Sequence, residues 1–201
     1  ERKKRGGESA LELEAVRFAL PGGETLSFRG RIDRIDVSAD GKTIRVLDYK
    51  TGKIPDDFKR KDADSEVAAD PFHGGERLQH AIYLLAASAA AKTLGAKTSD
   101  FAVRSGYYFL KKAENGREPF LYIDGARWKE FEPQFKKILS LFVKGMRRGM
   151  FFPHPGEENC GNCPYSDACE VSVDIEFERI REDAFIKEFL SLKGAEQDVG
   201  K

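Results

Sequence analysis

Two aspartates and a lysine in the segment RGRIDRIDVSADGKTIRVLDYKTG, residues 29–52, have the types and spacing to perform chemistry. An Asp-Gly pair at 40–41 separates two runs of alternating apolar and polar residues, which is typical of a β-hairpin with a tight turn. A turn centred on that pair places residues opposite each other when their numbers add up to about 81. Asp33 then lies opposite Asp48, and the side chain of Lys50 leaves the same face of the ribbon.

Two carboxylates that face each other across an antiparallel strand pair lie roughly 5 Å apart and repel each other. A divalent cation would remove that repulsion, because hard oxygen ligands at this separation suit Mg²⁺ or Mn²⁺. Lys50 could then orient a water molecule or stabilise charge that develops on a phosphate. The residues therefore predict a site for metal-assisted phosphodiester hydrolysis. The alternative is a solvated strand end without a ligand, and a bulge that shifted the register by one residue would abolish the pairing.

The chain's three cysteines form a second group, Cys160, Cys163 and Cys169, within the segment CGNCPYSDAC. So close a group argues against the disulfide scaffold of a secreted protein and for a metal or redox site in the cytoplasm. Thiolates favour zinc or iron–sulfur clusters. Zinc held by the three cysteines and His154 is one alternative, and three reduced, buried thiols are another.

Alternating runs predict the strands that must position the carboxylates. They cover residues 11–20, 25–37 and 43–50, joined by turns into an antiparallel meander. In the register described above, Asp36 faces Arg45 on the other side of the ribbon, so we predict an ordinary ion pair there.

The rest of the chain predicts two further strands and three helices. The strands lie at residues 103–112 and 118–124, around a turn at Asn115 and Gly116. Helical spacing of apolar residues predicts helices at residues 76–94, 126–150 and 174–192, with Pro133 marking a break or the first turn of the second. The order βββ–α–ββ–α indicates a mixed α/β or α+β domain.

The composition bounds the possible functions. Of 201 residues, 40% are hydrophobic and 34% charged, which favours a packed core with a charged surface. The formal net charge is zero, so any affinity for nucleic acid must come from local patches such as the basic runs at 2–5, 59–61 and 147–148. No apolar run reaches membrane-spanning length, and no signal-peptide pattern opens the chain.

The pattern GRIDRID…DG…VLDYKTG strongly resembles the signature of PD-(D/E)XK nucleases of the RecB/AddB type. The resemblance implies a restriction-endonuclease-like core, with a central mixed sheet opened by an antiparallel meander and flanked by helices. It implies that Asp33 and Asp48 bind Mg²⁺ or Mn²⁺ with the backbone carbonyl of Tyr49, and that Lys50 is catalytic.

The family also carries a glutamine and a tyrosine four residues apart on one face of a helix, which correspond to Gln79 and Tyr83. The resemblance implies that both lie beside the active site and bind the DNA strand. We expect His80 to point to another face of that helix and to be structural or peripheral.

The cysteine spacing is similar to the C-terminal triplet of AddB-type nucleases, in which a cysteine far upstream completes a 4Fe–4S cluster. No cysteine precedes Cys160, and residues 1–10 contain no counterpart of the metal-ligating histidine that the family carries on a helix ahead of its first strand. The chain also begins with Glu1. We therefore expect a chain cut just upstream of the strands, with the fourth cysteine outside it and with impaired cluster binding and nuclease activity.

These observations predict a flexible leader at residues 1–10, a nuclease core at 11–152 without its upstream helix, and a cysteine-containing segment with a closing helix at 153–201. The resemblance implies a cytoplasmic, Mg²⁺-dependent deoxyribonuclease, an exonuclease rather than an endonuclease. Its partners would be DNA and a helicase, either as a subunit or as a domain of the same polypeptide, in double-strand break repair. The alternatives are a stand-alone CRISPR-associated RecB-like exonuclease and a non-catalytic module that binds DNA ends.

Overall fold

The computed structural model describes residues 15–52, 71–97, 101–110, 120–152, 160–161, 163–165, 169 and 173–193. The predicted leader, the turn at Asn115 and Gly116, His154 and the basic runs at 2–5 and 59–61 lie outside these residues. The chain divides into two compact units, one of Glu1–Ala68 and Gln79–Trp128 and the other of Ala69–Leu78 and Lys129–Lys201. The predicted division into leader, core and cysteine segment stays a prediction.

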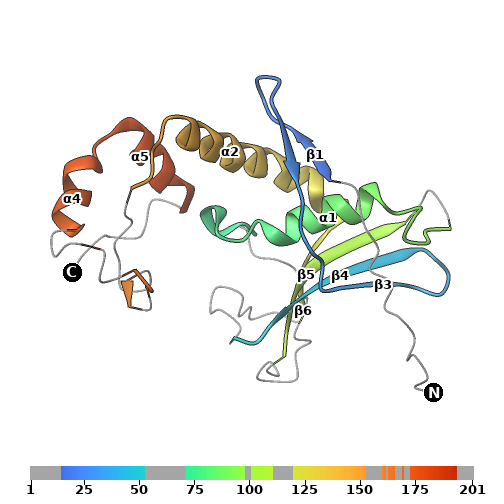
Figure 1. Ribbon diagram of the computed structural model, residues 1–201. Coiled ribbons are helices and arrows are strands. Elements are labelled where there is room, and N and C mark those ends of the chain that lie inside the picture. Colours follow the sequence, from blue (N-terminus) through green and yellow to red (C-terminus); the bar gives the residue numbers. More distant parts are fainter. Residues whose placement is uncertain are drawn as a thin grey trace, which may run out of the picture. The chain divides into compact units, whose positions relative to one another are not determined.

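The first unit contains a four-stranded mixed sheet in the order β3-β4-β5-β6 (Figure 1). Its strands are β3 (Arg34–Val37), β4 (Thr43–Lys50), β5 (Ala102–Phe109) and β6 (Phe120–Asp124). β3 and β4 are antiparallel, β4 and β5 parallel, and β5 and β6 antiparallel. The predicted mixed α/β class is therefore confirmed, as is the antiparallel pairing of the strands on either side of Asn115 and Gly116.

The register of the β3–β4 hairpin is the predicted one. Arg34 pairs with Leu47 and Asp36 pairs with Arg45, so the paired numbers add up to 81. At the turn, Gly41 has a φ of +71°, a conformation that favours glycine. One position beyond the last ladder pair, the same register places Asp33 opposite Asp48.

The segment predicted as one strand, residues 25–37, is interrupted. β1 (Val16–Ala19) and β2 (Thr25–Phe28) form a separate two-stranded sheet, and β3 begins only at Arg34. Gly30 lies in the interruption, and the carbonyl of Arg31 accepts a hydrogen bond from a side chain instead of a strand neighbour. The antiparallel pairs of the predicted meander are present, but they belong to two sheets.

Helix α1 (Gln79–Ala89) packs against β4, β5 and β6 within the first unit (Figure 1). Ala81 and Leu84 of the helix are buried with Ile44, Val46 and Val103 of the sheet. Successive strand residues point to opposite faces, so the residues at positions 44, 46, 48 and 50 of β4 share one face. This apolar packing fixes the face of β4 on which Asp48 and Lys50 lie.

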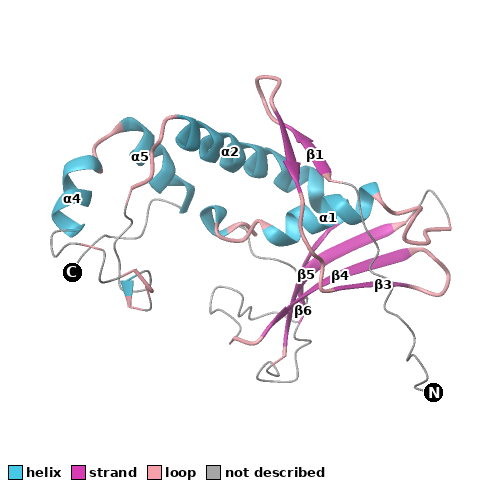
Figure 2. Cartoon of the chain, in the orientation of Figure 1, coloured by secondary structure: helices cyan, strands magenta, loops and turns pink. Residues whose placement is uncertain are grey.

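The second unit is helical among its described residues (Figure 2). It contains η2 (His73–Gly75), α2 (Trp128–Arg147), α4 (Val173–Ile180), α5 (Ala184–Leu190) and η6 (Ser191–Lys193). The short helix η4 (Gly125–Arg127) precedes α2. Phe72 packs edge-on against Phe131 and also contacts Phe135, which gives the unit an aromatic core.

Two details of the predicted helices were wrong. Pro133 lies inside α2 and marks neither a break nor the first turn. The single helix predicted at 174–192 is divided in two, because the carboxylate of Asp183 caps the N-terminus of α5 by accepting from the Phe185 backbone N–H at 2.7 Å. In the part of the chain that the structure describes, no helix is long and apolar enough to cross a lipid bilayer.

Candidate active site

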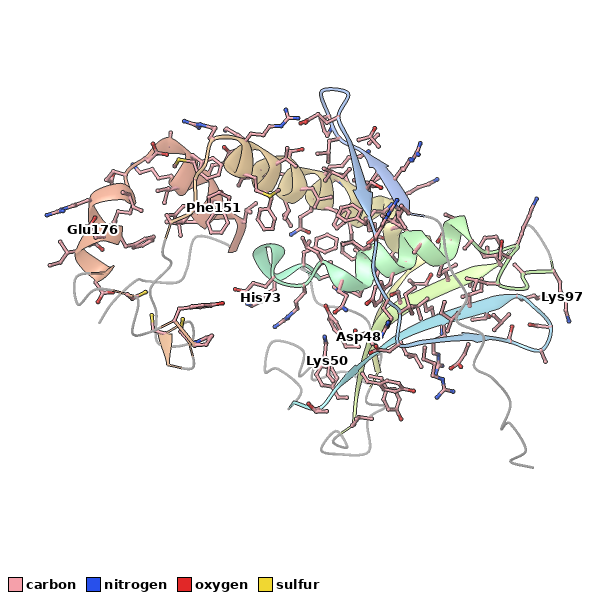
Figure 3. The ribbon with its side chains drawn as sticks, in the orientation of Figure 1. Asp48, Lys50, His73, Lys97, Phe151 and Glu176 are labelled. Carbon is pink, nitrogen blue, oxygen red and sulfur yellow. The ribbon has the colours of Figure 1, made fainter. Side chains whose placement is uncertain are left out.

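Asp48 is a buried carboxylate near the end of β4, with 5% of its surface exposed (Figure 3). Its Oδ2 lies 2.5 Å from Lys50 Nζ, but the approach does not meet the geometry of a hydrogen bond, and this oxygen has no hydrogen-bond partner in the structure. A buried carboxylate oxygen normally requires such partners. In this structure the ammonium group of Lys50 lies against that oxygen, so a divalent cation would bind Asp48 in its place or beside it.

Asp33 lies directly before β3 and is exposed. Its Oδ2 accepts a hydrogen bond from the backbone N–H of Tyr49 at 3.0 Å, which brings the carboxylate to the end of β4. The N–H and C=O groups of a strand residue point toward the same neighbouring strand. The carbonyl of Tyr49 is therefore directed toward the Asp33 side of β4.

Lys50 places its ammonium group among residues from three elements. Besides Asp48 on β4, its Nζ contacts Gln79 Oε1 on α1 at 3.3 Å. It also lies 4.8 Å from the ring centroid of Tyr107 on β5, a cation–π arrangement. Figure 3 shows Asp48 and Lys50 close together, far along the strand from the turn near Lys97. These contacts hold the ammonium group of Lys50 against the Asp48 carboxylate.

Gln79 contacts Lys50, and Tyr83 contacts Gln79. Gln79 Nε2 donates to Tyr83 Oη at 2.8 Å, and Tyr83 Oη donates to the Arg31 carbonyl at 2.5 Å. Burial raises the pKa of Tyr83, the hydrogen bond from Gln79 lowers it, and the charges of Asp48 and Asp33 raise it further. The charges of both carboxylates therefore influence the pKa of the same hydroxyl group.

The contact with Tyr107 was not predicted from the sequence. Tyr107 pairs with Asp48 across the parallel β4–β5 ladder, and its hydroxyl lies 3.1 Å from Nδ1 of the buried His80. Nothing in the sequence gives the register of two parallel strands that lie so far apart. His80 packs its ring against Tyr107, in agreement with the structural role predicted for it.

Asp36 lies on the other face of the hairpin, opposite Arg45 in the ladder. Its Oδ1 accepts a hydrogen bond from Arg34 Nε at 2.8 Å, so this carboxylate has a cationic partner on its own strand. Asp36 therefore has an ion pair within β3, and its predicted ion pair with Arg45 stays a prediction. Asp36 differs in this respect from Asp48.

The donor set suits a hard divalent cation. Two carboxylates and one directed carbonyl offer only oxygen atoms, the ligands that Mg²⁺ and Mn²⁺ prefer. No cluster of three or more His, Cys, Asp or Glu side chains with metal-binding geometry occurs among the described residues. Magnesium in proteins usually keeps several water ligands or binds phosphate oxygens of its substrate.

The three cysteines are free thiols. Cys160 and Cys169 are exposed and Cys163 is partly buried. Cys160 and Cys163 share a turn, in which the Cys163 N–H donates to the Cys160 carbonyl at 3.2 Å. These thiols belong to the described part of the chain, and there they do not come together with metal-binding geometry.

Comparison with known proteins gives a family match and several partial relatives. The model of the PD-(D/E)XK nuclease superfamily matches residues 1–170. The chain is 35% identical over 75 residues to an ATP-dependent helicase/deoxyribonuclease subunit of Clostridium perfringens strain SM101, covering 36% of this chain and 6% of that protein. It is 36% identical over 83 residues to the protein of the same name from Symbiobacterium thermophilum, covering 40% of this chain and 6% of the relative.

The chain thus spans only about 6% of the length of the curated relatives it matches. No solved structure matches it significantly. The mixed sheet flanked by a helix is consistent with the restriction-endonuclease-like fold of the matched superfamily. From the family match, which covers most of the sequence, and from the acidic hairpin end beside a lysine, it follows that the chain belongs to the PD-(D/E)XK nuclease superfamily.

Proposed function

We propose that this chain is the nuclease domain of a metal-dependent deoxyribonuclease, similar to the C-terminal part of AddB-like helicase–nuclease subunits. The observation that carries the proposal is the buried Asp48 carboxylate, which pairs with Lys50 at the strand end that Asp33 approaches and has one oxygen without a hydrogen bond. The relatives are named as helicase/deoxyribonuclease subunits, which supports DNA as the substrate and a helicase as the partner. Such a protein would act in the cytoplasm on double-strand breaks.

In the proposed mechanism, Asp33, Asp48 and the Tyr49 carbonyl would hold Mg²⁺ or Mn²⁺. When bound, the cation would activate a water molecule for attack on phosphorus and offset the charge of the phosphate oxygens. Lys50 orients that water or stabilises the negative charge that develops on the phosphate. One phosphorus–oxygen bond forms to the water oxygen, the bond to the leaving sugar oxygen breaks, and the products carry a phosphomonoester and a hydroxyl end.

The ammonium group of Lys50 suits this role because its surroundings fix its position. The side chain is 39% exposed, so the group can reach a substrate phosphate. Gln79 and Tyr107 limit its motion from α1 and β5. A positioned donor stabilises developing charge better than a mobile one, because it needs no reorganisation during the reaction.

Cleavage of two DNA substrates tests the proposal. With Mg²⁺, the wild-type chain is expected to degrade linear duplex DNA and to leave covalently closed circular DNA intact, as an exonuclease would. The double variant Asp33→Asn, Asp48→Asn should cleave neither substrate while keeping the circular-dichroism spectrum of the wild type. Equal activity of the double variant would refute the proposal, and wild-type cleavage of the circular substrate would refute the exonuclease assignment alone.

We further propose that Cys160, Cys163 and Cys169 supply three ligands of a 4Fe–4S cluster, with the fourth cysteine outside this chain. The spacing supports this assignment, and zinc is the alternative metal. No catalytic step depends on the cluster. Its expected role is to order the segment around it, since metal binding supplies folding free energy to ligands that are not assembled beforehand.

A further inference from the structure

A continuous chain of hydrogen bonds runs from Lys50 through Gln79 and Tyr83 to the backbone of Arg31. The successive distances are 3.3, 2.8 and 2.5 Å. We propose that Gln79 and Tyr83 are positioning residues that couple the segment carrying Asp33 to the ammonium group of Lys50. The inference deepens the proposed function and rests on it, because the coupling matters for catalysis only if Asp33 and Lys50 act together.

The donor and acceptor roles of the groups fix which atom donates in each of these hydrogen bonds. A backbone carbonyl can only accept, so the single hydroxyl proton of Tyr83 points to the Arg31 oxygen. Tyr83 Oη must then accept from the amide NH₂ of Gln79, which turns Gln79 Oε1 toward Lys50. A tyrosine hydroxyl is protonated at neutral pH, and burial raises the pKa of Tyr83 further, so this group can donate.

The hydrogen-bond series ends at Arg31, in a stretch of backbone that is not paired with a strand. Arg31 belongs to the interruption between β2 and β3, two residues before Asp33. Two contacts hold this segment at the site: Tyr83 Oη to the Arg31 carbonyl, and the Tyr49 N–H to the Asp33 carboxylate. The first anchors the segment to α1, and the second anchors it to β4.

The anchor on α1 is firm. Tyr83 is 8% exposed, and its neighbours Ala81 and Leu84 are buried against the sheet. Gln79 and Tyr83 are four residues apart and therefore lie on the same face of the helix. Because helix packing fixes Tyr83, its hydroxyl can hold the segment before β3, which the β-ladder does not include. Through Gln79 it can also align that segment with Lys50.

This role differs from direct binding of DNA. The side-chain polar atoms of Gln79 and Tyr83 already make hydrogen bonds to other protein groups. A residue that binds DNA should affect the KM for DNA, whereas a residue that aligns Asp33 and Lys50 should affect kcat and metal affinity. Outer residues that orient metal ligands typically change affinity or activity by about 10–100-fold.

The variant Tyr83→Phe removes the hydroxyl and keeps the buried ring. Without metal or DNA, the exchange of the Tyr49 backbone N–H with solvent should become roughly fivefold faster, because its acceptor Asp33 loses the anchor at Arg31. Mn²⁺ should bind roughly tenfold more weakly, and kcat on linear DNA should fall by a similar factor with KM unchanged. Exchange can be followed by NMR and binding by calorimetry.

Two further variants make the test specific. Gln79→Glu keeps an oxygen for Lys50 but has no N–H to donate to Tyr83, so it should reproduce the faster exchange at Tyr49. Tyr108→Phe is the matched control: its position on β5 next to Tyr107 places it on the opposite face, where its ring contacts Tyr49 edge-on. This control should keep the wild-type exchange rate and Mn²⁺ affinity.

Wild-type exchange at Tyr49 in both Tyr83→Phe and Gln79→Glu would overturn the inference. A raised KM for DNA with unchanged Mn²⁺ affinity would overturn it too, in favour of a direct contact with DNA. Failure of the proposed function has a different signature, in which Asp33→Ala binds Mn²⁺ as tightly as the wild type. If only the coupling is wrong, Asp33→Ala weakens Mn²⁺ binding and Tyr83→Phe does not.

Discussion

The end of the β3–β4 hairpin and the cysteine segment both carry metal-binding residue types, but they differ in how the protein holds them. Asp33, Asp48 and Lys50 are tied to two strands and a helix by a ladder and specific hydrogen bonds. The cysteine thiols are exposed or half-buried, and the backbone contact between Cys160 and Cys163 is a local turn. The fold brings the hairpin residues together, whereas under our proposal the thiols come together only when the cluster binds.

This difference has an energetic consequence. At the hairpin, packing of α1 on the sheet has already overcome the entropy of bringing the carboxylates together, so metal binding reorganises little. In the cysteine segment, the free energy of cluster binding must order the ligands as well. Substitutions at the hairpin should therefore affect chemistry strongly and stability weakly, whereas loss of the cysteines should alter only the properties that depend on the cluster.

The largest effect is expected for Asp48→Asn. Losing a ligand charge in a buried metal site should lower the rate of Mg²⁺-dependent cleavage by roughly 10³-fold, about 4 kcal/mol of transition-state stabilisation. The free energy of unfolding without metal should fall by only about 1–2 kcal/mol, because asparagine keeps the shape of aspartate but loses the ion pair with Lys50. Asp36→Asn, on the other face of the hairpin, should retain activity. Similar losses in both variants would contradict the distinction between the two aspartates.

Lys50→Ala should have the second-largest effect. Removing a positioned donor from a developing negative charge typically lowers kcat on the order of 10²-fold. The carboxylates remain, so Mn²⁺ affinity measured by calorimetry should stay within roughly threefold of the wild type. A large loss of Mn²⁺ affinity would show that Lys50 organises the acidic residues rather than acting on the substrate.

Gly41→Ala tests whether the turn sets the register. Gly41 has a φ of +71°, and a Cβ there would lie 2.6 Å from Lys97 Cγ and 3.0 Å from the Gly95 carbonyl oxygen. Urea denaturation should show a loss of about 2–3 kcal/mol in the free energy of unfolding. Gly149, in the second unit, has a similar φ of +65° but nothing within 4 Å. Gly149→Ala should lose only about 1 kcal/mol, and equal losses would contradict a crowded turn.

The smallest effect on stability is expected for the cysteines. Replacing Cys160, Cys163 and Cys169 together by serine should change the free energy of unfolding of the metal-free protein by less than about 0.5 kcal/mol, since exposed substitutions rarely matter more. After anaerobic reconstitution with iron and sulfide, the wild type should show the visible absorption of a cluster at reduced occupancy, because one of the four ligands lies outside this chain, and the variant should show none. A large loss of stability without metal would mean that the thiols belong to a packed core.

The hairpin register could be predicted from the sequence because turn chemistry and alternation are local signals. An Asp-Gly turn and buried Ile44 and Val46 leave a single pairing that hides the apolar face. The interruption at Arg31 could not be predicted in this way, because alternation continues through it and the competing hydrogen bond comes from Tyr83, far along the chain. Tyr107 was missed for a similar reason, since its place beside Asp48 depends on a parallel pairing that only the tertiary fold defines.

The central claim is that Asp33 and Asp48 form one metal site, and calorimetric titration with Mn²⁺ tests it most directly. Wild-type protein should bind the ion, Asp33→Ala should bind it at least roughly tenfold more weakly, and Asp36→Ala should bind it as the wild type does, because that carboxylate faces Arg34. Equal Mn²⁺ affinity in the wild type and Asp33→Ala would contradict the claim and leave the hairpin end as a solvated strand terminus.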